Sequence, residues 1–266
     1  PSLANENNIG EDKCYHIDED ACLWIDGATV THTVSTSNSF VIYGKLKITN
    51  PESVVNINTN GQGHGILMRE KAAIEIYEGQ LTTPCIRNSA IGGVQRGSYT
   101  QRGGTVILTG NIEGSSDHPT FSMTYEEMAF NMSGGTLIIQ QATDDGDAAG
   151  FSMVLGMKPE NASITGGTIQ INIQNRNANF TSTIPLWNLV INSNSNFSST
   201  ITNFPGSLSS RQVNAQPLIV LNDFVLNGTS IFNANNQYVT IGHNFTTNNN
   251  ARYTPGNNTT IFNGNG

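Results

Sequence analysis

The chain has 266 residues, of which only 12% are charged, and 20 acidic against 12 basic side chains give a net charge of −8. An acidic chain without a basic stripe is a poor partner for nucleic acid, so we expect none. No apolar run is long enough to form a transmembrane helix. Helix formers are sparse, whereas Asn, Thr, Ser and Gly are abundant, which favours short strands joined by turns.

Residues 1–35 form an acidic N-terminal segment, which we interpret as a candidate cap for the fold that follows. Seven acids precede residue 27, against a single Lys13: Glu6, Glu11, Asp12, Asp18, Glu19, Asp20 and Asp26. Cys14 and Cys22 are spaced to close a small disulfide loop, as in exported proteins. The alternative is that both, together with Cys85, are thiols packed as small hydrophobes.

The region 36–182 repeats one phrase three times: Gly-Gly-Thr followed by an apolar, β-branched run. The copies begin at Gly103, Gly134 and Gly166, at intervals of 31 and 32 residues. A fixed interval of this size is typical of a stacked repeat. Each copy joins a tight glycine turn to residues that fit a pleated surface. We therefore predict that it forms one corner and one strand of each coil, and that the loops between copies protrude.

One of these loops carries the weak candidates for a metal site, Asp144, Asp145 and Asp147. Carboxylate oxygens on a glycine-kinked loop suit Ca²⁺. Their spacing is neither that of an EF-hand nor that of the calcium-binding nonapeptide solenoid, and a solvated loop tip is the alternative. We expect no other cofactor.

The region 183–266 is rich in Asn and Thr, and after residue 176 only Arg211, Asp223 and Arg252 are charged. Its apolar stretches are four to eight residues long and bounded by Asn, Gly or Pro, as short strands are. The phrases that open at Pro185 and Pro217 recur at 32 residues, with about three extra residues in the second copy. We predict a right-handed parallel β-helix with coils of roughly 30 residues. Since an open last coil would expose unpaired backbone edges, we expect the polypeptide to continue.

No motif identifies a catalytic or metal centre. The five histidines have no partners at metal-ligand spacing, and we interpret them as scattered surface or turn residues. They are His16, His32, His64, His118 and His243.

An enzyme is the alternative to consider, because polysaccharide lyases and hydrolases also use parallel β-helices. Their sites need convergent carboxylates, or Ca²⁺ with a basic residue. Asp117, Glu126 and Glu127 are the nearest candidates, beside His118, but their spacing does not place them in one groove. We therefore predict no catalytic residues.

Exposed aromatic rings could form a platform for sugars without any chemistry. The only tryptophans are Trp24 and Trp187. Trp187 lies within an apolar strand phrase, so we predict that it packs in the core.

The region 183–266 resembles the repeat modules of very large cell-surface proteins of Bacteroidetes. Five phrases of such modules stand in order: 221–224 (LNDF), 232–235 (FNAN), 239–242 (VTIG), 253–257 (YTPGN) and 262–264 (FNG). One departure is His243, which stands where a second glycine is usual and could alter the local turn. The Gly-Gly-Thr region resembles these modules only in its general pattern of short strands and turns.

The resemblance implies export by the type IX secretion system and an adhesin-like, gliding-motility or surface-layer role, with no catalytic residue to carry over. We expect a non-catalytic structural or adhesive segment of a large secreted bacterial protein, located outside the cell at its surface. Its expected partners are the secretion machinery during export, and a surface glycan or other cells afterwards. The alternative is a polysaccharide-binding or polysaccharide-degrading β-helix protein.

Overall fold

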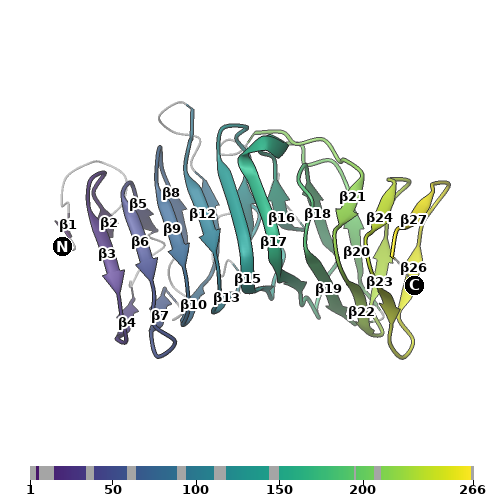
Figure 1. The fold of residues 1–266 in the computed structure, drawn as a ribbon, viewed down its shortest axis with the longest axis horizontal. Helices are drawn as coiled ribbons and strands as arrows, with labels where there is room; N and C mark the ends of the chain where they lie inside the picture. The colour runs from purple at the N-terminus through teal and green to yellow at the C-terminus, as the bar shows by residue number, and fades with distance from the viewer. Residues whose placement is uncertain are drawn as a thin grey trace.

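The computed structural model describes residues 4–5, 15–33, 39–58, 64–88, 94–110, 118–143, 150–194, 196–206 and 211–264. Its strands stack along one axis, and the chain runs from one end of the stack to the other (Figure 1). The one helical element of the described residues is a short 3-10 turn, η1 (Pro159–Asn161). The predicted all-β parallel β-helix is confirmed.

Face 1 of the stack is a sheet of 11 strands, and all of its pairs are parallel except β1 with β2. Its strands in order are β1 (Ala4–Asn5), β2 (Tyr15–Ile17), β5 (Phe40–Ile42), β8 (Ile66–Met68), β11 (Ile86–Asn88), β14 (Phe121–Met123), β16 (Phe151–Leu155), β18 (Ala178–Ser182), β20 (Ser198–Ile201), β23 (Ile231–Asn233) and β26 (Arg252–Thr254).

Face 2 and face 3 share a 13-stranded sheet, because β15 (Ala129–Ile139) and β17 (Ala162–Ile171) run from one face into the next. Face 2 contains β3 (Cys22–Ile25), β6 (Lys45–Ile48), β9 (Ala73–Ile76), β12 (Ser98–Gln101) and the first halves of β15 and β17. It continues, through the bridge Leu186–Val220, as the 3-stranded sheet of β21 (Leu218–Val220), β24 (Val239–Ile241) and β27 (Thr260–Phe262).

Face 3 completes each coil. It contains β4 (Thr29–His32), β7 (Val54–Ile57), β10 (Gln80–Thr83), β13 (Thr105–Leu108), the second halves of β15 and β17, β19 (Asn188–Ser193), β22 (Phe224–Gly228) and β25 (Phe245–Thr247).

The Gly-Gly-Thr phrase forms the corner between face 2 and face 3. Thr105, Thr136 and Thr168 are register partners in three successive coils. The glycine before each threonine has a positive φ, for example 74° at Gly135. The prediction of one corner and one strand per copy is therefore confirmed.

Outside these coils the length of a coil varies. Ile169 pairs with Leu189, 20 residues later, and Leu189 pairs with Phe224, 35 residues later. Only the strand residues must stay in register, so the corners absorb the difference. Leu186 lies opposite Val220, beyond the second Pro-Leu pair, which agrees with the extra residues predicted for that copy.

Alternate side chains of each strand point into the stack and form a continuous core. Leu46, Ile74, Tyr99 and Phe130 are register partners in four coils, and all are 0% exposed. The rings of Tyr99 and Phe130 stack with centroids 5.4 Å apart. Burying such columns of apolar and aromatic side chains is the main favourable term in the free energy of folding.

Phe204 and Val213, which lie between β20 and β21, cover part of the outer side of face 1. Phe204 and Val213 pair through an antiparallel bridge and pack with Phe151 and Val154 in a second apolar cluster. Val154 points away from the main core, so this cover explains why it is buried.

Alanine substitutions at Gly135 and Gly228 test how closely the backbones of neighbouring coils approach at the corner. A Cβ on Gly135 would lie 2.3 Å from the carbonyl oxygen of Gly103, whereas a Cβ on Gly228 would have no atom nearer than 3.9 Å. Both have a positive φ, so Gly228→Ala should cost about 1–2 kcal/mol of unfolding free energy for the backbone alone. Gly135→Ala should cost more than about 3 kcal/mol, because it also forces the coils apart. Urea unfolding of both variants measures the difference, and equal losses would contradict this view of the corner.

Candidate functional site

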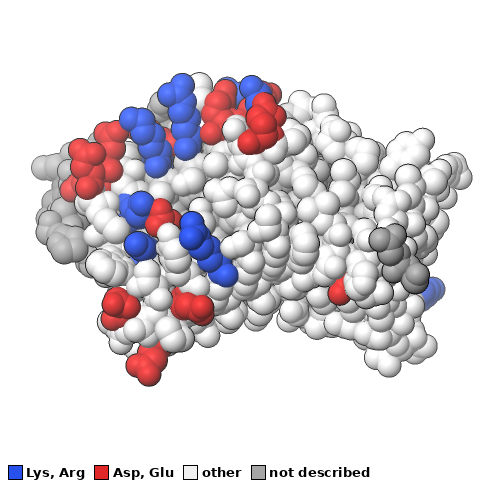
Figure 2. Space-filling view, viewed as in Figure 1, with Lys and Arg blue, Asp and Glu red and all other residues white. Residues whose placement is uncertain are grey.

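Ionisable side chains are concentrated over the N-terminal half of the stack. Figure 2 shows Lys, Arg, Asp and Glu crowded on that side of the molecule, whereas the C-terminal part is almost uncharged. The charged side chains in the middle of this view come from face 2, and they are the most distinctive chemical feature of the described surface.

Four residues on the outer side of face 2 alternate between aromatic rings and cations. The Nζ atom of Lys47 lies 5.2 Å from the ring centroid of Trp24 and 5.3 Å from that of Tyr77. The guanidinium carbon of Arg102 lies 4.9 Å from the ring centroid of Tyr77. We call Trp24, Lys47, Tyr77 and Arg102 the cation–aromatic strip.

Strand register assembles this strip from four successive coils. Trp24 and Lys47 are partners across β3 and β6, and they point outward because the next residue of each strand is buried. Tyr77 and Arg102 directly follow β9 and β12, and the amide of Arg102 donates to the carbonyl oxygen of Ile76, one coil earlier. Lys47 is in register with Glu75, two residues before Tyr77. The strip therefore crosses the coils obliquely, with Trp24 and Lys47 in one column and Tyr77 and Arg102 in the next.

The two cations of the strip contact aromatic rings, whereas their neighbour Lys45 contacts a carboxylate. Lys45 forms an ion pair with Glu75 at 2.6 Å, and the hydrogen bond to Glu75 raises the pKa of Lys45. Lys47 and Arg102 belong to none of the ion pairs between described residues. A ring holds a cation with about 0.5–1 kcal/mol at an exposed site without cancelling its charge.

A hollow of about 390 Å³ continues the strip beyond Arg102. Hydroxyl and amide groups dominate its wall, which consists of Thr100, Gln101, Arg102, Asn131, Met132, Ser133 and Ser163. Gln101 is buried and fixed, because it accepts from the hydroxyl of Tyr99 at 2.7 Å and donates to the carbonyl oxygen of Thr136 at 3.2 Å. The hollow thus presents neutral donors and acceptors next to a positive charge.

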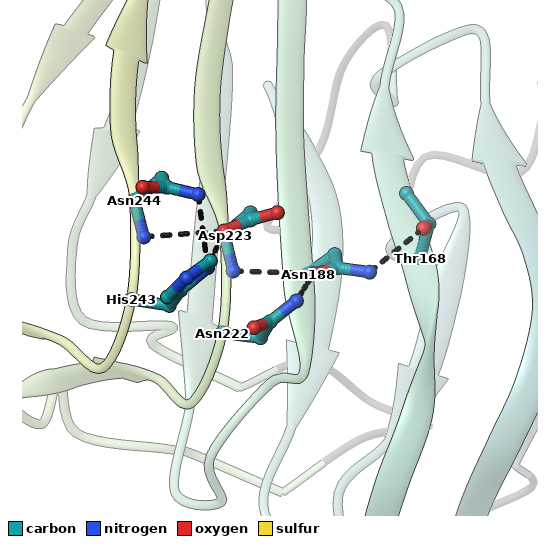
Figure 3. A network of polar contacts seen from close by, with 6 residues as sticks. All are labelled: Thr168, Asn188, Asn222, Asp223, His243 and Asn244. Carbon is teal, nitrogen blue, oxygen red and sulfur yellow. Dashed lines mark hydrogen bonds and ion pairs between the residues drawn. The ribbon is translucent and has the colours of Figure 1, made fainter. Parts of the chain in front are cut away.

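A second polar feature follows the Gly-Gly-Thr corner into the C-terminal coils (Figure 3). The side-chain amide of Asn188 donates to the hydroxyl of Thr168 at 3.3 Å. Its side-chain oxygen accepts from the side-chain amide of Asn222 and from the backbone amide of Asp223. One Asp223 carboxylate oxygen lies 2.7 Å from Nδ1 of His243.

Asn244 extends this network on the next coil, where its backbone amide donates to Asp223 at 3.1 Å. Asn188, Asn222 and His243 each contact a group of an adjacent coil, whereas the side chain of Asn244 contacts the ring of His243. We interpret the network as structural. His243 is not among the residues with a positive φ, so its backbone does not require a glycine, and its ring has a carboxylate partner in Asp223.

Several residues named from the sequence lie outside the described part of the chain: Cys14, Asp117, Asp144, Asp145 and Asp147. The calcium site and the disulfide therefore stay predictions. Cys22 is exposed on β3, whereas Cys85 is a buried thiol whose pKa is raised by burial.

The remaining carboxylates weighed for an enzyme do not form a cluster with other acids. Glu126 is exposed and lies 3.6 Å from Lys158, and Glu127 is exposed beside it on a turn. Among the described residues, no group of three or more His, Cys, Asp and Glu side chains could hold a metal ion.

The interpretation of the histidines as surface or turn residues was wrong for His16 and His32, which are buried within strands. His118 lies at a bend but is also buried. Burial, with smaller contributions from Arg87 and His64, lowers the pKa of His118 to about 2. The prediction of a core position for Trp187 was also wrong, since its side chain is partly exposed. Trp24 is the more exposed tryptophan, at 61%.

Comparisons with family models, curated proteins and solved structures find no match to this chain. Among the described residues, no helix is both long and apolar enough to cross a membrane. Function must therefore be argued from the surface itself and from the resemblance of residues 183–266.

The cation–aromatic strip is not predicted by any pattern in the sequence. Its members are unevenly spaced along the chain, so no period reveals them. The available signal was local: Trp24 and Lys47 each occupy the outward position of a strand whose alternate residues are apolar.

The Asp223–His243 pair makes stability depend weakly on pH. Burial raises the pKa of Asp223, but hydrogen bonds from His243 and from the Asn244 amide outweigh it, so the net pKa is lowered. A lowered carboxyl pKa adds stability above the ordinary value, about 3.9, and this is lost as the pH falls through the folded-state pKa. Asp223→Asn should therefore cost less than about 1 kcal/mol at neutral pH, because the pair is exposed.

Urea unfolding of Asp223→Asn and of the wild type at pH 7 and pH 3 tests this dependence. The difference between the two proteins should shrink at the lower pH. A difference that stays constant would mean that Asp223 acts only through its shape, and His243→Gln should then fail to couple to it in a double-mutant cycle.

Proposed function

We propose that this chain is a non-catalytic structural and adhesive segment of a large secreted bacterial surface protein. The observation that carries the proposal is the unbroken stack, in which face 1 stays in parallel register from β2 to β26. In such a stack each coil contacts only its neighbours, and the result is a stiff rod that can display side chains far from its point of attachment.

The described surface supports a role in contact and not in chemistry. Its carboxylates are dispersed, paired with cations or used in the polar network at the corner. Acid–base catalysis on a sugar chain needs two carboxyl groups that converge on one bond. The cation–aromatic strip and the adjoining hollow offer recognition groups without that arrangement.

The location and export route follow from the resemblance alone. We propose that the protein acts outside the cell at its surface and that the type IX secretion machinery is its partner during export. The Asn- and Thr-rich outer sides of the C-terminal coils suit this setting, because amide and hydroxyl groups keep a rod soluble without a strong charge.

Attachment and turnover separate an adhesive rod from an enzyme. Beads coated with the purified chain should retain bacterial cells or polysaccharide-coated particles, whereas beads coated with the heat-unfolded chain should not. Polysaccharides incubated with the chain should gain no reducing ends and no unsaturated products. Release of such products, abolished by Glu126→Gln or by Asp117→Asn, would contradict the non-catalytic role.

A further inference from the structure

We propose that the cation–aromatic strip and the hollow beside it bind an acidic polysaccharide, whose carboxylates contact Lys47 and Arg102. The inference rests on the adhesive role proposed above and names the chemical class of the ligand. It is carried by the arrangement of the side chains along face 2.

The first argument is that the two cations are held in place but not neutralised. Lys47 lies against the rings of Trp24 and Tyr77, and Arg102 lies against Tyr77. Rings restrict the motion of long side chains, so less conformational entropy is lost when an anion binds. Glu75 is the register partner of Lys47, but its carboxylate forms an ion pair with Lys45 at 2.6 Å, which leaves Lys47 and Arg102 as the groups for a ligand.

The second argument is the spacing along the axis. Lys47 belongs to β6, and Arg102 follows β12, two coils further along face 2. Neighbouring strands lie about 4.8 Å apart, so the two cations are separated by about 10 Å along the stack. A linear chain with carboxylates at intervals can meet both cations, whereas one small anion cannot.

The third argument is the chemistry of the hollow. Thr100, Asn131, Ser133 and Ser163 line it with hydroxyl and amide groups directly beyond Arg102. These groups donate to and accept from sugar hydroxyls equally well. A polymer that carries both acid groups and many hydroxyls therefore matches the strip and the hollow together.

Other polyanions fit the surface less well. Nucleic acid binds through many neutralised phosphates, whereas the strip offers two cations on a chain of net charge −8. An anionic membrane is flat and would require a broader basic surface. Both become outcomes of the test.

Titration with polygalacturonate, followed by calorimetry at low salt, tests the proposal on the whole chain. The wild type should bind polygalacturonate and should bind its fully methyl-esterified form at least tenfold more weakly, since a charge-assisted hydrogen bond is lost with each ester. Lys47→Gln and Arg102→Gln should each weaken binding about tenfold. The double variant should not bind measurably.

Lys71→Gln is the matched control, because it removes one positive charge from an exposed side chain on a turn away from the strip. It should bind like the wild type. Equal weakening by Lys71→Gln would reduce the effect to net charge and overturn the proposal, as would unchanged binding in the double variant with an unchanged melting temperature. Tighter binding of a single-stranded oligonucleotide or of anionic phospholipid vesicles would also overturn it.

Failure of this inference and failure of the proposed function give different results. If coated beads still retain cells while polygalacturonate does not bind, the adhesive role stands and the ligand class is wrong. If polygalacturonate binds and is cleaved, the ligand class stands and the non-catalytic role is wrong.

Discussion

The parallel register between coils is the constraint on which the rest of this structure depends. A strand can form its backbone hydrogen bonds only if the next coil places a strand alongside it, in register and in the same direction. Column after column of side chains then repeats along the axis, and the inward columns, such as the one containing Leu46, Tyr99 and Phe130, become the core. The glycines of the corner are needed because the backbones of neighbouring coils approach within van der Waals contact there.

The same register organises the surface, because outward side chains also form columns. Like charges stacked at the spacing of neighbouring strands would repel each other. The N-terminal coils avoid this by placing cations beside rings or acids: Lys47 stands in register between Trp24 and Glu75, and Lys45 forms an ion pair with Glu75. The C-terminal coils avoid it with neutral amides, and the contact between Asn188 and Asn222 is an example. The N-terminal and C-terminal coils therefore have different surfaces, although the same problem of stacked charges applies to both.

The corners are not bound by strand register, and the variation in coil length occurs there. Coils as different as 20 and 35 residues stack equally well, since the extra length leaves the stack between strands. Between β20 and β21, Phe204 and Val213 pack on the outer side of face 1. The corners and the outward positions can therefore change without altering the core.

The sequence by itself determined the fold class, because the Gly-Gly-Thr corner and its β-branched strand are local signals that recur at a nearly constant interval. It also determined the lack of charge in the C-terminal third. The tertiary structure alone decided which residues from different coils become neighbours. The cation–aromatic strip is an example, because its four residues come from successive coils that are joined by connections of unequal length. Burial of His118 and pairing of His243 with Asp223 had the same cause: contacts across coils depend on register, and register depends on corner lengths that no local pattern specifies.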